Sequence, residues 1–332
     1  MSLIQIIKIA FQRIYQAKFY VFAAYLGNLI LAAIPGLMLA SELQGSIGAS
    51  LAGDKLRRGF DDLWFRHFEA GASGISETFD PSIVGIGAIF NGIDVFLSGN
   101  FFSEYGAIVA FGVLYWGFWI FLAAGFISVF LRNDSAVEKK TEFMKGAGEN
   151  FLRFLLLGSL AGVIYVFVFG ALFPLLTTLV NSLTREMVDE RTVFNYTVAK
   201  YAIIWIIVLS INFTFDYAKI ITASKRLTFR TVIAAPAMAL RFFRRNLFKV
   251  IAFYAVNGIF WFAILGLYWL ISSGAWQSSW FTIVFAFLIG QVYIFSRIAL
   301  KCFLYAGETV IYQHRKSGRI PKSQPLVQEA AG

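Results

Sequence analysis

The stretch that decides the fold runs from Tyr105 to Leu131 and reads YGAIVAFGVLYWGFWIFLAAGFISVFL. It contains no Asp, Glu, Lys or Arg, and it exceeds the roughly 20 residues that a helix needs to cross the hydrocarbon of a bilayer. Its apolar residues do not alternate with polar ones, as they would in a membrane β-strand. Because backbone groups in lipid must be bonded within the segment, the stretch predicts a transmembrane helix.

Further apolar runs of similar length lie on both sides of this stretch. Hydrophobic residues make up 58% of the chain and charged residues 14%, whereas soluble chains carry about 25% charged residues. The composition excludes a soluble domain and a disordered chain, and the single cysteine, Cys302, excludes an internal disulfide. We therefore predict an all-α, polytopic integral membrane protein with about six transmembrane helices, the other five being Phe19–Ala40, Phe151–Val180, Tyr201–Thr222, Val250–Ile271 and Trp280–Tyr305.

The runs divide the chain into five regions. The third run is long enough to tilt or to split, and Pro174 lies near its outer end. The predicted regions are an amphipathic leader (1–18), the first transmembrane helix (19–40), an extracytoplasmic loop or cap (41–104), a five-helix transmembrane region (105–306) that includes an amphipathic segment (226–246), and a cytoplasmic tail (307–332).

Basic residues gather on one side of the predicted spans. Of the 29 Lys and Arg residues, 22 fall in the segments at that side, which include both termini. Cytoplasmic loops carry the excess of Lys and Arg, so both termini are predicted to be cytoplasmic, in a bacterial inner (plasma) membrane. The net charge of +10 is then a topology signal. Nucleic acid is not expected as a partner, because the basic residues flank membrane spans.

Two segments are predicted to lie along the membrane. In the leader, polar residues recur at steps of three and four opposite an apolar face, so this helix either lies on the inner leaflet or packs against neighbouring helix ends. In the second segment, Pro236 is expected in the first turn of a helix. Four arginines there are candidates for binding anionic lipids, or serve only to enforce topology: Arg230, Arg241, Arg244 and Arg245.

The loop at 41–104 is the only sizeable segment outside the predicted spans. Lys55–Glu69 is expected to form a helix, and the glycine-interrupted stretch Ile83–Leu97 is too short to span, so it is expected to be re-entrant or interfacial. This cap is a candidate to hold a lipid or a protein partner, and the alternative is that it shields the outer helix ends.

Ionisable residues inside the spans are the main candidates for a functional site. Asp216 lies about 22 Å along the fourth span and Arg297 about 26 Å along the sixth, at 1.5 Å per residue. Because their depths match, we expect Asp216 to pair with Arg297 or, failing that, with a neighbouring lysine; the alternative is a proton or substrate relay. The full set of intramembrane polar candidates is Asn212, Asp216, Lys219, Arg297 and Lys301.

Two stretches suggest a parallel internal repeat. Asn150-Phe-Leu-Arg-Phe-Leu-Leu-Leu opens the third span, and Asn246-Leu-Phe-Lys-Val-Ile-Ala-Phe opens the fifth. Each follows a charged segment and a span that runs in the opposite direction. Both copies would therefore point the same way through the membrane, as parallel repeats do.

Two further motifs carry a resemblance. These are Phe215-Asp-Tyr-Ala-Lys in the inner half of span four and Ala239-Leu-Arg-Phe-Phe-Arg-Arg-Asn before span five. With them, roughly residues 105–310 resemble uncharacterised bacterial six-span membrane proteins, which include the membrane domain associated with glycerophosphoryl diester phosphodiesterases. The resemblance implies a membrane fold and no activity, because no phosphodiesterase domain accompanies it here.

The sequence contains no motif for a cofactor or for catalysis. It has two histidines and no HExxH, GxxxxGK[ST] or GxGxxG pattern, so we predict no metal site, no cofactor and no catalytic residues. The first functional hypothesis is a non-enzymatic accessory or organising component of a membrane assembly. The second is a transporter or lipid-handling protein with a polar site around Asp216, and the third is an outward-facing enzyme that uses the acidic loop.

Overall fold

The computed structural model describes residues 1–48, 51–58, 61–79, 109–132, 136–272 and 279–317. Within these ranges the chain forms helices and no strand, and six helical segments are long and apolar enough to cross a membrane. The all-α, multi-pass prediction is therefore confirmed. The longer elements are α1 (Leu3–Gln16), α2 (Lys18–Ile47), α3 (Ala52–Arg58), α4 (Asp62–Gly71), α7 (Val109–Leu131), α8 (Ala136–Phe167), α9 (Phe173–Thr184), α10 (Glu190–Lys225), α11 (Ala235–Ile271) and α12 (Trp280–Ser317), and the short turns are η1 (Gly74–Thr78), η3 (Val168–Leu172) and η4 (Val232–Ala234).

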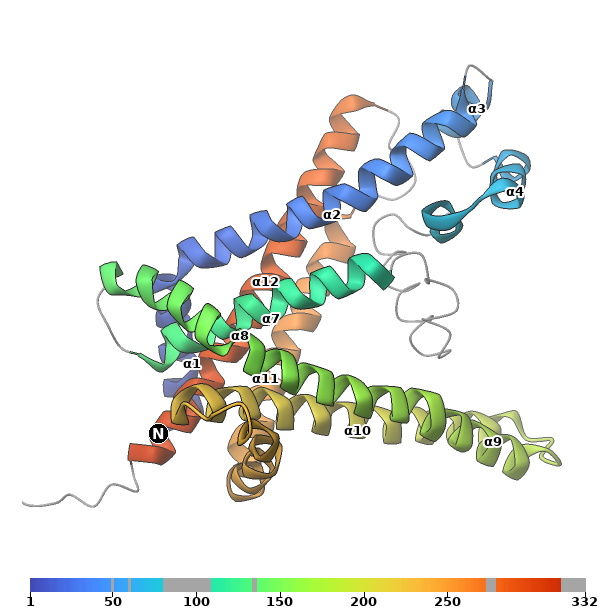
Figure 1. Cartoon of the computed structure of the whole chain (residues 1–332). Coiled ribbons are helices and arrows are strands. Elements are labelled where there is room, and N and C mark those ends of the chain that lie inside the picture. Colours follow the sequence, from blue (N-terminus) through green and yellow to red (C-terminus); the bar gives the residue numbers. More distant parts are fainter. Residues whose placement is uncertain (49–50, 59–60, 80–108, 133–135, 273–278, 318–332) are drawn as a thin grey trace, which may run out of the picture.

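The helices pack together at one end of the molecule and diverge at the other (Figure 1). We call the packed end, which holds the start of α1, the end of α12 and the last turns of α7 and α10, the near end. There α12 contacts α1, α2, α7, α10 and α11. Fully buried aromatic rings fill this end, among them Phe126, Phe154, Phe253 and Phe303. At the opposite, far end, α2 and α9 point apart and leave large apolar side chains exposed.

The third span, for which the sequence leaves open a tilt or a split, is one helical segment that contains a π turn. Between α8 and α9 the turn η3 is a π-helix, and Pro174 follows it in the first turn of α9. Proline has no backbone N–H and its ring clashes with the carbonyl four residues earlier, here that of Gly170. The wider π turn accommodates both defects.

The leader helix α1 packs against the bundle on one face. Its N-terminus has a reciprocal cap, in which the Ser2 hydroxyl accepts from the Gln5 N–H and the Gln5 side chain accepts from the Ser2 N–H. Ile6 and Ala10 are buried, whereas Ile4 and Tyr15 are 77% and 71% exposed. One face of the leader therefore packs against neighbouring helices, and another leaves apolar side chains open to the membrane.

The sixth span extends further than its hydropathy indicates. The helix α12 does not end near Tyr305 but continues to Ser317, and Val310 and Ile311 in this extension are buried. The segment from residue 307 therefore begins as part of the packed bundle, and residues 318–332 lie outside the described ranges.

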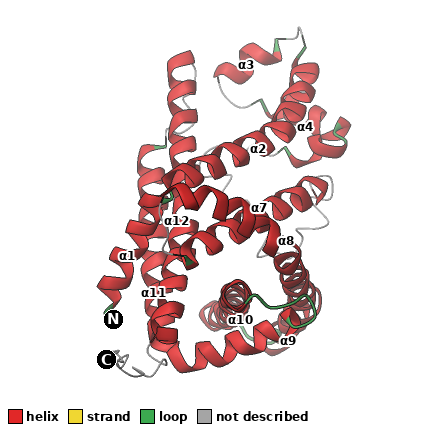
Figure 2. Ribbon diagram, turned by 60° about the vertical axis from the view of Figure 1, so that its left-hand side comes forward, coloured by secondary structure: helices red, strands yellow, loops and turns green. Residues whose placement is uncertain are grey.

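A sharp turn joins α10 to α11. Arg226 ends α10 in a left-handed conformation (φ 49°), and Pro236 lies in the first turn of α11 as predicted. Within α11, Asn246 leaves the helical conformation (φ −131°, ψ 21°) and divides the amphipathic start from the fifth span. Beyond this kink α11 runs beside α12, as Figure 2 shows from a second direction.

The segment at 41–104 is described in part. The helix expected over Lys55–Glu69 is replaced by two short helices, α3 and α4, with residues 59–60 outside the described ranges. Phe68 is buried against the rings of Trp64 and Phe79, and η1 contacts α2. The stretch Ile83–Leu97, for which we predict a re-entrant segment, also lies outside the described residues.

Candidate functional site

Asp216 forms an ion pair inside the bundle with a residue of its own helix. The Lys219 Nζ lies 2.9 Å from the Asp216 Oδ1, and the two side chains are 19% and 15% exposed. Residues three apart on a helix face the same way, so this pair forms within α10. The expected pair with Arg297 is wrong and the second choice, Lys219, is the partner, because equal depth does not make two side chains face each other.

Two further side chains complete what we call the acid–base cluster: Asp216, Lys219, Tyr254 and Glu308. The Tyr254 hydroxyl of α11 donates to the Glu308 Oε1 of α12 and lies 3.4 Å from the Asp216 Oδ2. Glu308 is fully buried. Among the described residues its Oε2 has no hydrogen-bond partner, and no basic group lies within ion-pair distance of it.

A glycine explains how this cluster assembles. A Cβ on Gly307 would overlap the ring of Phe253, so α11 and α12 approach closely at this point only because residue 307 has no side chain. The close approach brings Tyr254 against Glu308, the residues that follow Phe253 and Gly307. The ring of Tyr254 also packs edge-on against Phe213 of α10, with centroids 4.1 Å apart. Three helices therefore position the cluster.

Asn212 lies one helical turn from Asp216, towards the far end. It is exposed, and its Oδ1 accepts a hydrogen bond of 3.0 Å from the Tyr165 hydroxyl of α8. Asn212 therefore links α8 to α10 beside the cluster, without a direct hydrogen bond to it among the described residues.

Arg297 and Lys301 lie apart from the cluster, in what we call the cationic pocket. This cavity of about 370 Å³ lies between α2, α7 and α12. The Lys301 Nζ sits 4.4 Å from the ring centroid of Trp119, and the Arg297 guanidinium 5.7 Å from that of Tyr293. Neither cation forms an ion pair with a carboxylate of the described chain. The residues that line the pocket are Asn28, Tyr115, Trp119, Ile294, Arg297, Ile298 and Lys301.

The near end is closed by Arg13, a residue that the sequence does not single out. Its guanidinium donates to the Phe130 carbonyl (2.8 Å), the Thr309 hydroxyl (3.0 Å) and the Gln313 side chain (2.7 Å). Burial lowers the pKa of Arg13 to about 10, so the group remains charged at neutral pH. Because Phe130 is in the last turn of α7, Arg13 bonds a helix carbonyl that has no partner within its helix.

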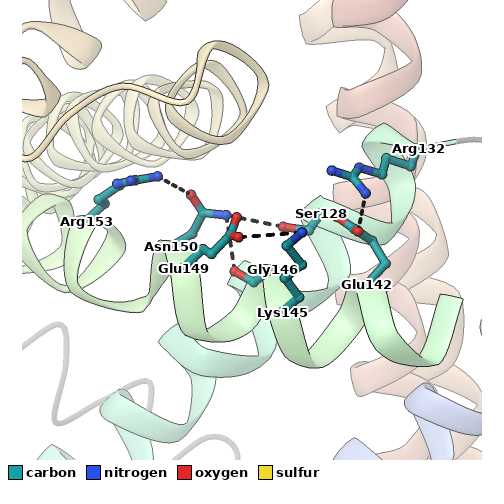
Figure 3. A network of polar contacts seen from close by, with 8 residues as sticks. All are labelled: Ser128, Arg132, Glu142, Lys145, Gly146, Glu149, Asn150 and Arg153. Carbon is teal, nitrogen blue, oxygen red and sulfur yellow. Dashed lines mark hydrogen bonds and ion pairs between the residues drawn. The ribbon is translucent and has the colours of Figure 1, made fainter. Parts of the chain in front are cut away.

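The turn between α7 and α8 carries its own polar network (Figure 3). Arg132 forms an ion pair with Glu142. The buried Asn150 side chain donates to the Ser128 hydroxyl (3.3 Å) and to the Gly146 carbonyl (3.1 Å). A Cβ on Gly146 would overlap Ser128, so the two helices are in close contact here. These groups join α7 to α8, and they lie outside the acid–base cluster.

The four arginines proposed to bind anionic lipids are all exposed near the start of α11: Arg230, Arg241, Arg244 and Arg245. On the same segment, Phe242 points inward, with its ring centroid 5.0 Å from that of Tyr217 and 5.5 Å from that of Tyr312. The segment is therefore amphipathic, with aromatic rings on the bundle and arginines outside.

Tyr254 and Glu308 are the members of the cluster that the sequence analysis does not predict. The predicted span ends at Tyr305, so Glu308 falls in the predicted tail. The signal was present, because Thr309-Val-Ile-Tyr follows Glu308 and continues the apolar pattern for another turn.

No group of three or more His, Cys, Asp or Glu side chains within the described ranges is placed to hold a metal ion. Comparison with protein families, with curated proteins and with solved structures finds no match to the chain. The resemblance to six-span membrane domains therefore stays a prediction.

Proposed function

We propose that the chain is a non-enzymatic, lipid-handling membrane protein whose polar site includes the acid–base cluster. The observation that carries this proposal is that three ionisable side chains of α12 lack an ion-pair partner within the part of the chain that the structure describes. No described carboxylate lies within ion-pair distance of Arg297 or Lys301, and no described basic group lies within that distance of Glu308.

A purely structural role would predict a different arrangement. A charged side chain at the centre of a membrane helix costs about 2.5–3.5 kcal/mol on insertion scales. Charges that only pin two helices together are expected to pair across those helices, which Arg297, Lys301 and Glu308 of α12 do not do among the described residues. An ionisable residue inside a span is a candidate for a functional site by default.

Apolar cavities along α11 and α12 favour a lipid over a water-soluble solute. One has a volume of about 360 Å³ and includes Phe11, Phe260 and Phe303 in its walls. Another, of about 410 Å³, is lined by residues such as Leu267, Phe285 and Tyr268. Both are open and have the apolar walls that acyl chains require.

Lipid movement between leaflets tests the proposal. Purified protein is reconstituted into vesicles that contain fluorescent phosphatidylglycerol or phosphatidylcholine, and dithionite bleaches the label in the outer leaflet. We expect bleaching beyond the outer half to proceed faster with protein, and Asp216→Asn and Glu308→Gln to slow it. The exposed-pair variant Glu149→Gln is the control and should match the wild type. Bleaching no faster than in protein-free vesicles would refute the proposal.

An accessory or organising role is the second candidate. It is favoured by the far end of α2, which the described residues cover little, since Ile30 is 66% and Leu37 71% exposed there. A protein partner retained in a fixed ratio through gentle detergent purification would support this role. If such a partner is retained and the protein does not accelerate lipid movement in the vesicle test, the accessory role is favoured over lipid handling.

We also propose that the near end faces the cytoplasm, in a bacterial inner membrane. The support is that 22 of the 29 Lys and Arg residues fall in the sequence segments on one side of the spans, and that the start of α1 and the end of α12, which belong to those segments, lie at the near end (Figure 1). Reporter fusions after Ser98 should report the outside, and fusions after Gly332 the cytoplasm. Two fusions that report the same side would contradict this topology.

A further inference from the structure

We infer that the cationic pocket binds the phosphate group of an anionic phospholipid. Arg297 and Lys301 are four residues apart on α12, so both project from the same face of that helix into the pocket. Like charges at this spacing repel each other. No carboxylate of the described chain lies within ion-pair distance of either, so an anion between them would be the first counter-charge in direct contact with both.

The indole ring of Trp119 lines the same pocket and holds the Lys301 ammonium over its face, 4.4 Å from the ring centroid. A guanidinium and an ammonium together suit a phosphate, because phosphate offers several acceptor oxygens and Arg engages it through two parallel hydrogen bonds.

The surroundings favour a phosphate that is attached to a lipid over free phosphate. The pocket lies between α2, α7 and α12, within the segments that span the membrane. Asn28, at its edge, is ten residues or about 15 Å along α2 from Lys18. Ile294 and Ile298 form part of the wall. A free phosphate ion would have to cross hydrocarbon to reach this depth, whereas a headgroup enters sideways with its acyl chains in lipid.

The pocket and the acid–base cluster are neighbours. Lys301 interacts electrostatically with both Asp216 and Lys219. An anion bound at Lys301 would therefore act on the charge balance of the cluster. Only this link between the pocket and the cluster rests on the proposed function. Binding of the phospholipid itself is measured without any movement of lipid.

Native mass spectrometry of the detergent-purified full chain tests the binding. Dioleoylphosphatidylglycerol and dioleoylphosphatidylcholine are added in turn, and the lipid retained per protein is compared. We expect one phosphatidylglycerol to be retained with about tenfold preference, and Arg297→Gln with Lys301→Gln to abolish the preference. The matched control, Lys55→Gln with Arg66→Gln, removes one exposed Lys and one exposed Arg and should keep it.

A second measurement needs no variant. A photoactivatable phosphatidylglycerol should crosslink to peptides that contain Trp119 or Lys301, and unlabelled phosphatidylglycerol should compete with it. Crosslinks spread evenly over the spans, or equal retention of the two lipids, would overturn the inference. Competition by millimolar inorganic phosphate would show that free phosphate is the ligand, and would overturn the assignment to a lipid.

The two proposals fail separately. Retention of phosphatidylglycerol without acceleration of lipid movement would leave the pocket standing and reject the lipid-handling function. Accelerated movement without a preference for phosphatidylglycerol would reject the pocket and leave the function standing.

Discussion

The α7–α8 hairpin and the α10–α11 hairpin have second helices with a similar pattern of burial, yet their charged pairs lie in different places. In α7–α8 the ion pairs Arg132–Glu142 and Lys145–Glu149 lie at or near the turn (Figure 3). In α10–α11 the charged pair lies inside the bundle, where α11 supplies Tyr254 to it. Similar frameworks can therefore carry either a structural turn or an acid–base site, according to where the ionisable residues fall.

The second helices share a pattern of burial after an asparagine. The residues four and seven positions after Asn150, Phe154 and Leu157, are fully buried, and so are the residues at the same positions after Asn246. Each asparagine side chain also donates to the carbonyl four residues earlier. This shared arrangement agrees with the parallel repeat that the sequence suggests.

The backbones differ at the asparagines themselves. Asn150 also bonds Ser128 and accepts from Arg153, and α8 remains helical. Among the described residues, Asn246 has a side-chain hydrogen bond only within its own helix, and the backbone of α11 kinks there. The kink separates the arginine-rich start of α11 from its membrane span. The helix that continues straight is the one whose asparagine bonds to the other helix of its hairpin, through Ser128.

The largest expected effect is the difference in lost stability between breaking the charged pair of α10 and breaking the exposed charged pair of α8. Asp216→Asn leaves Lys219 as an uncompensated cation in the bundle, which should cost about 3 kcal/mol of unfolding free energy. The exposed pair is worth about 0.5 kcal/mol or less, so Glu149→Gln should have little effect. Thermal unfolding in one detergent measures both. The double variant Asp216→Asn with Lys219→Gln should recover part of the loss, and equal losses in Asp216→Asn and Glu149→Gln would contradict the comparison.

The next effect concerns helix contact within α7–α8. Gly146→Ala should cost about 1–3 kcal/mol, because its Cβ would collide with Ser128. Gly148 lies two residues along the same helix with open space around it, so Gly148→Ala should raise stability by up to about 1 kcal/mol. Melting midpoints that move in opposite directions would support the close contact, and midpoints that rise together would exclude it.

A smaller effect distinguishes the two asparagines. Asn150→Ala removes hydrogen bonds to Ser128 and Arg153 within a buried contact, and should cost about 1–2 kcal/mol. Asn246→Ala removes a bond within its own helix and supplies a better helix former at the kink. The loss should therefore be smaller at Asn246, as measured by thermal unfolding. A larger loss at Asn246 would mean that the kink itself stabilises the hairpin.

The smallest effect is at the start of α10. Hydrogen bonds from the Thr192 hydroxyl and from the N–H groups of Arg191 and Thr192 hold the pKa of the Asp189 carboxyl below its usual value. A carboxyl whose pKa is lowered by folding stabilises the fold above its unfolded pKa of about 4, and that contribution is lost as the pH falls through the folded value. Asp189→Asn keeps a capping side chain but removes the titrating carboxyl. The melting midpoint of the variant should therefore fall less than that of the wild type as the pH is lowered. Identical pH profiles of the melting midpoint for both proteins would refute this role.

The spans were predictable because hydropathy alone marks them. The six runs appear in the structure, and so does Pro236 in the first turn of α11. These features depend on local composition and on the missing N–H of proline. The extension of α12 to Ser317 was only partly indicated in this way, by the apolar residues after Glu308, because its polar residues bond to helices distant in sequence.

Half of the cluster, Asp216 and Lys219, was predictable from the sequence, and Tyr254 and Glu308 were not. Depth along a helix follows from residue count, so Asp216 and Arg297 were correctly singled out as charges inside spans. Which way a side chain faces depends on packing, and the contact of Phe253 with Gly307 sets the approach of α11 to α12. That contact decides the position of Glu308 and depends on residues far apart in the sequence.

Arg13 gives the order of synthesis a structural consequence. It lies in α1, and two of its three acceptors, Thr309 and Gln313, lie in α12, 296 and 300 residues later in the chain. These two hydrogen bonds cannot form before α12 has been synthesised, whereas the Phe130 carbonyl of α7 is available much earlier. The contact between α1 and α12 at the near end is therefore completed late, after the helices between them have been made.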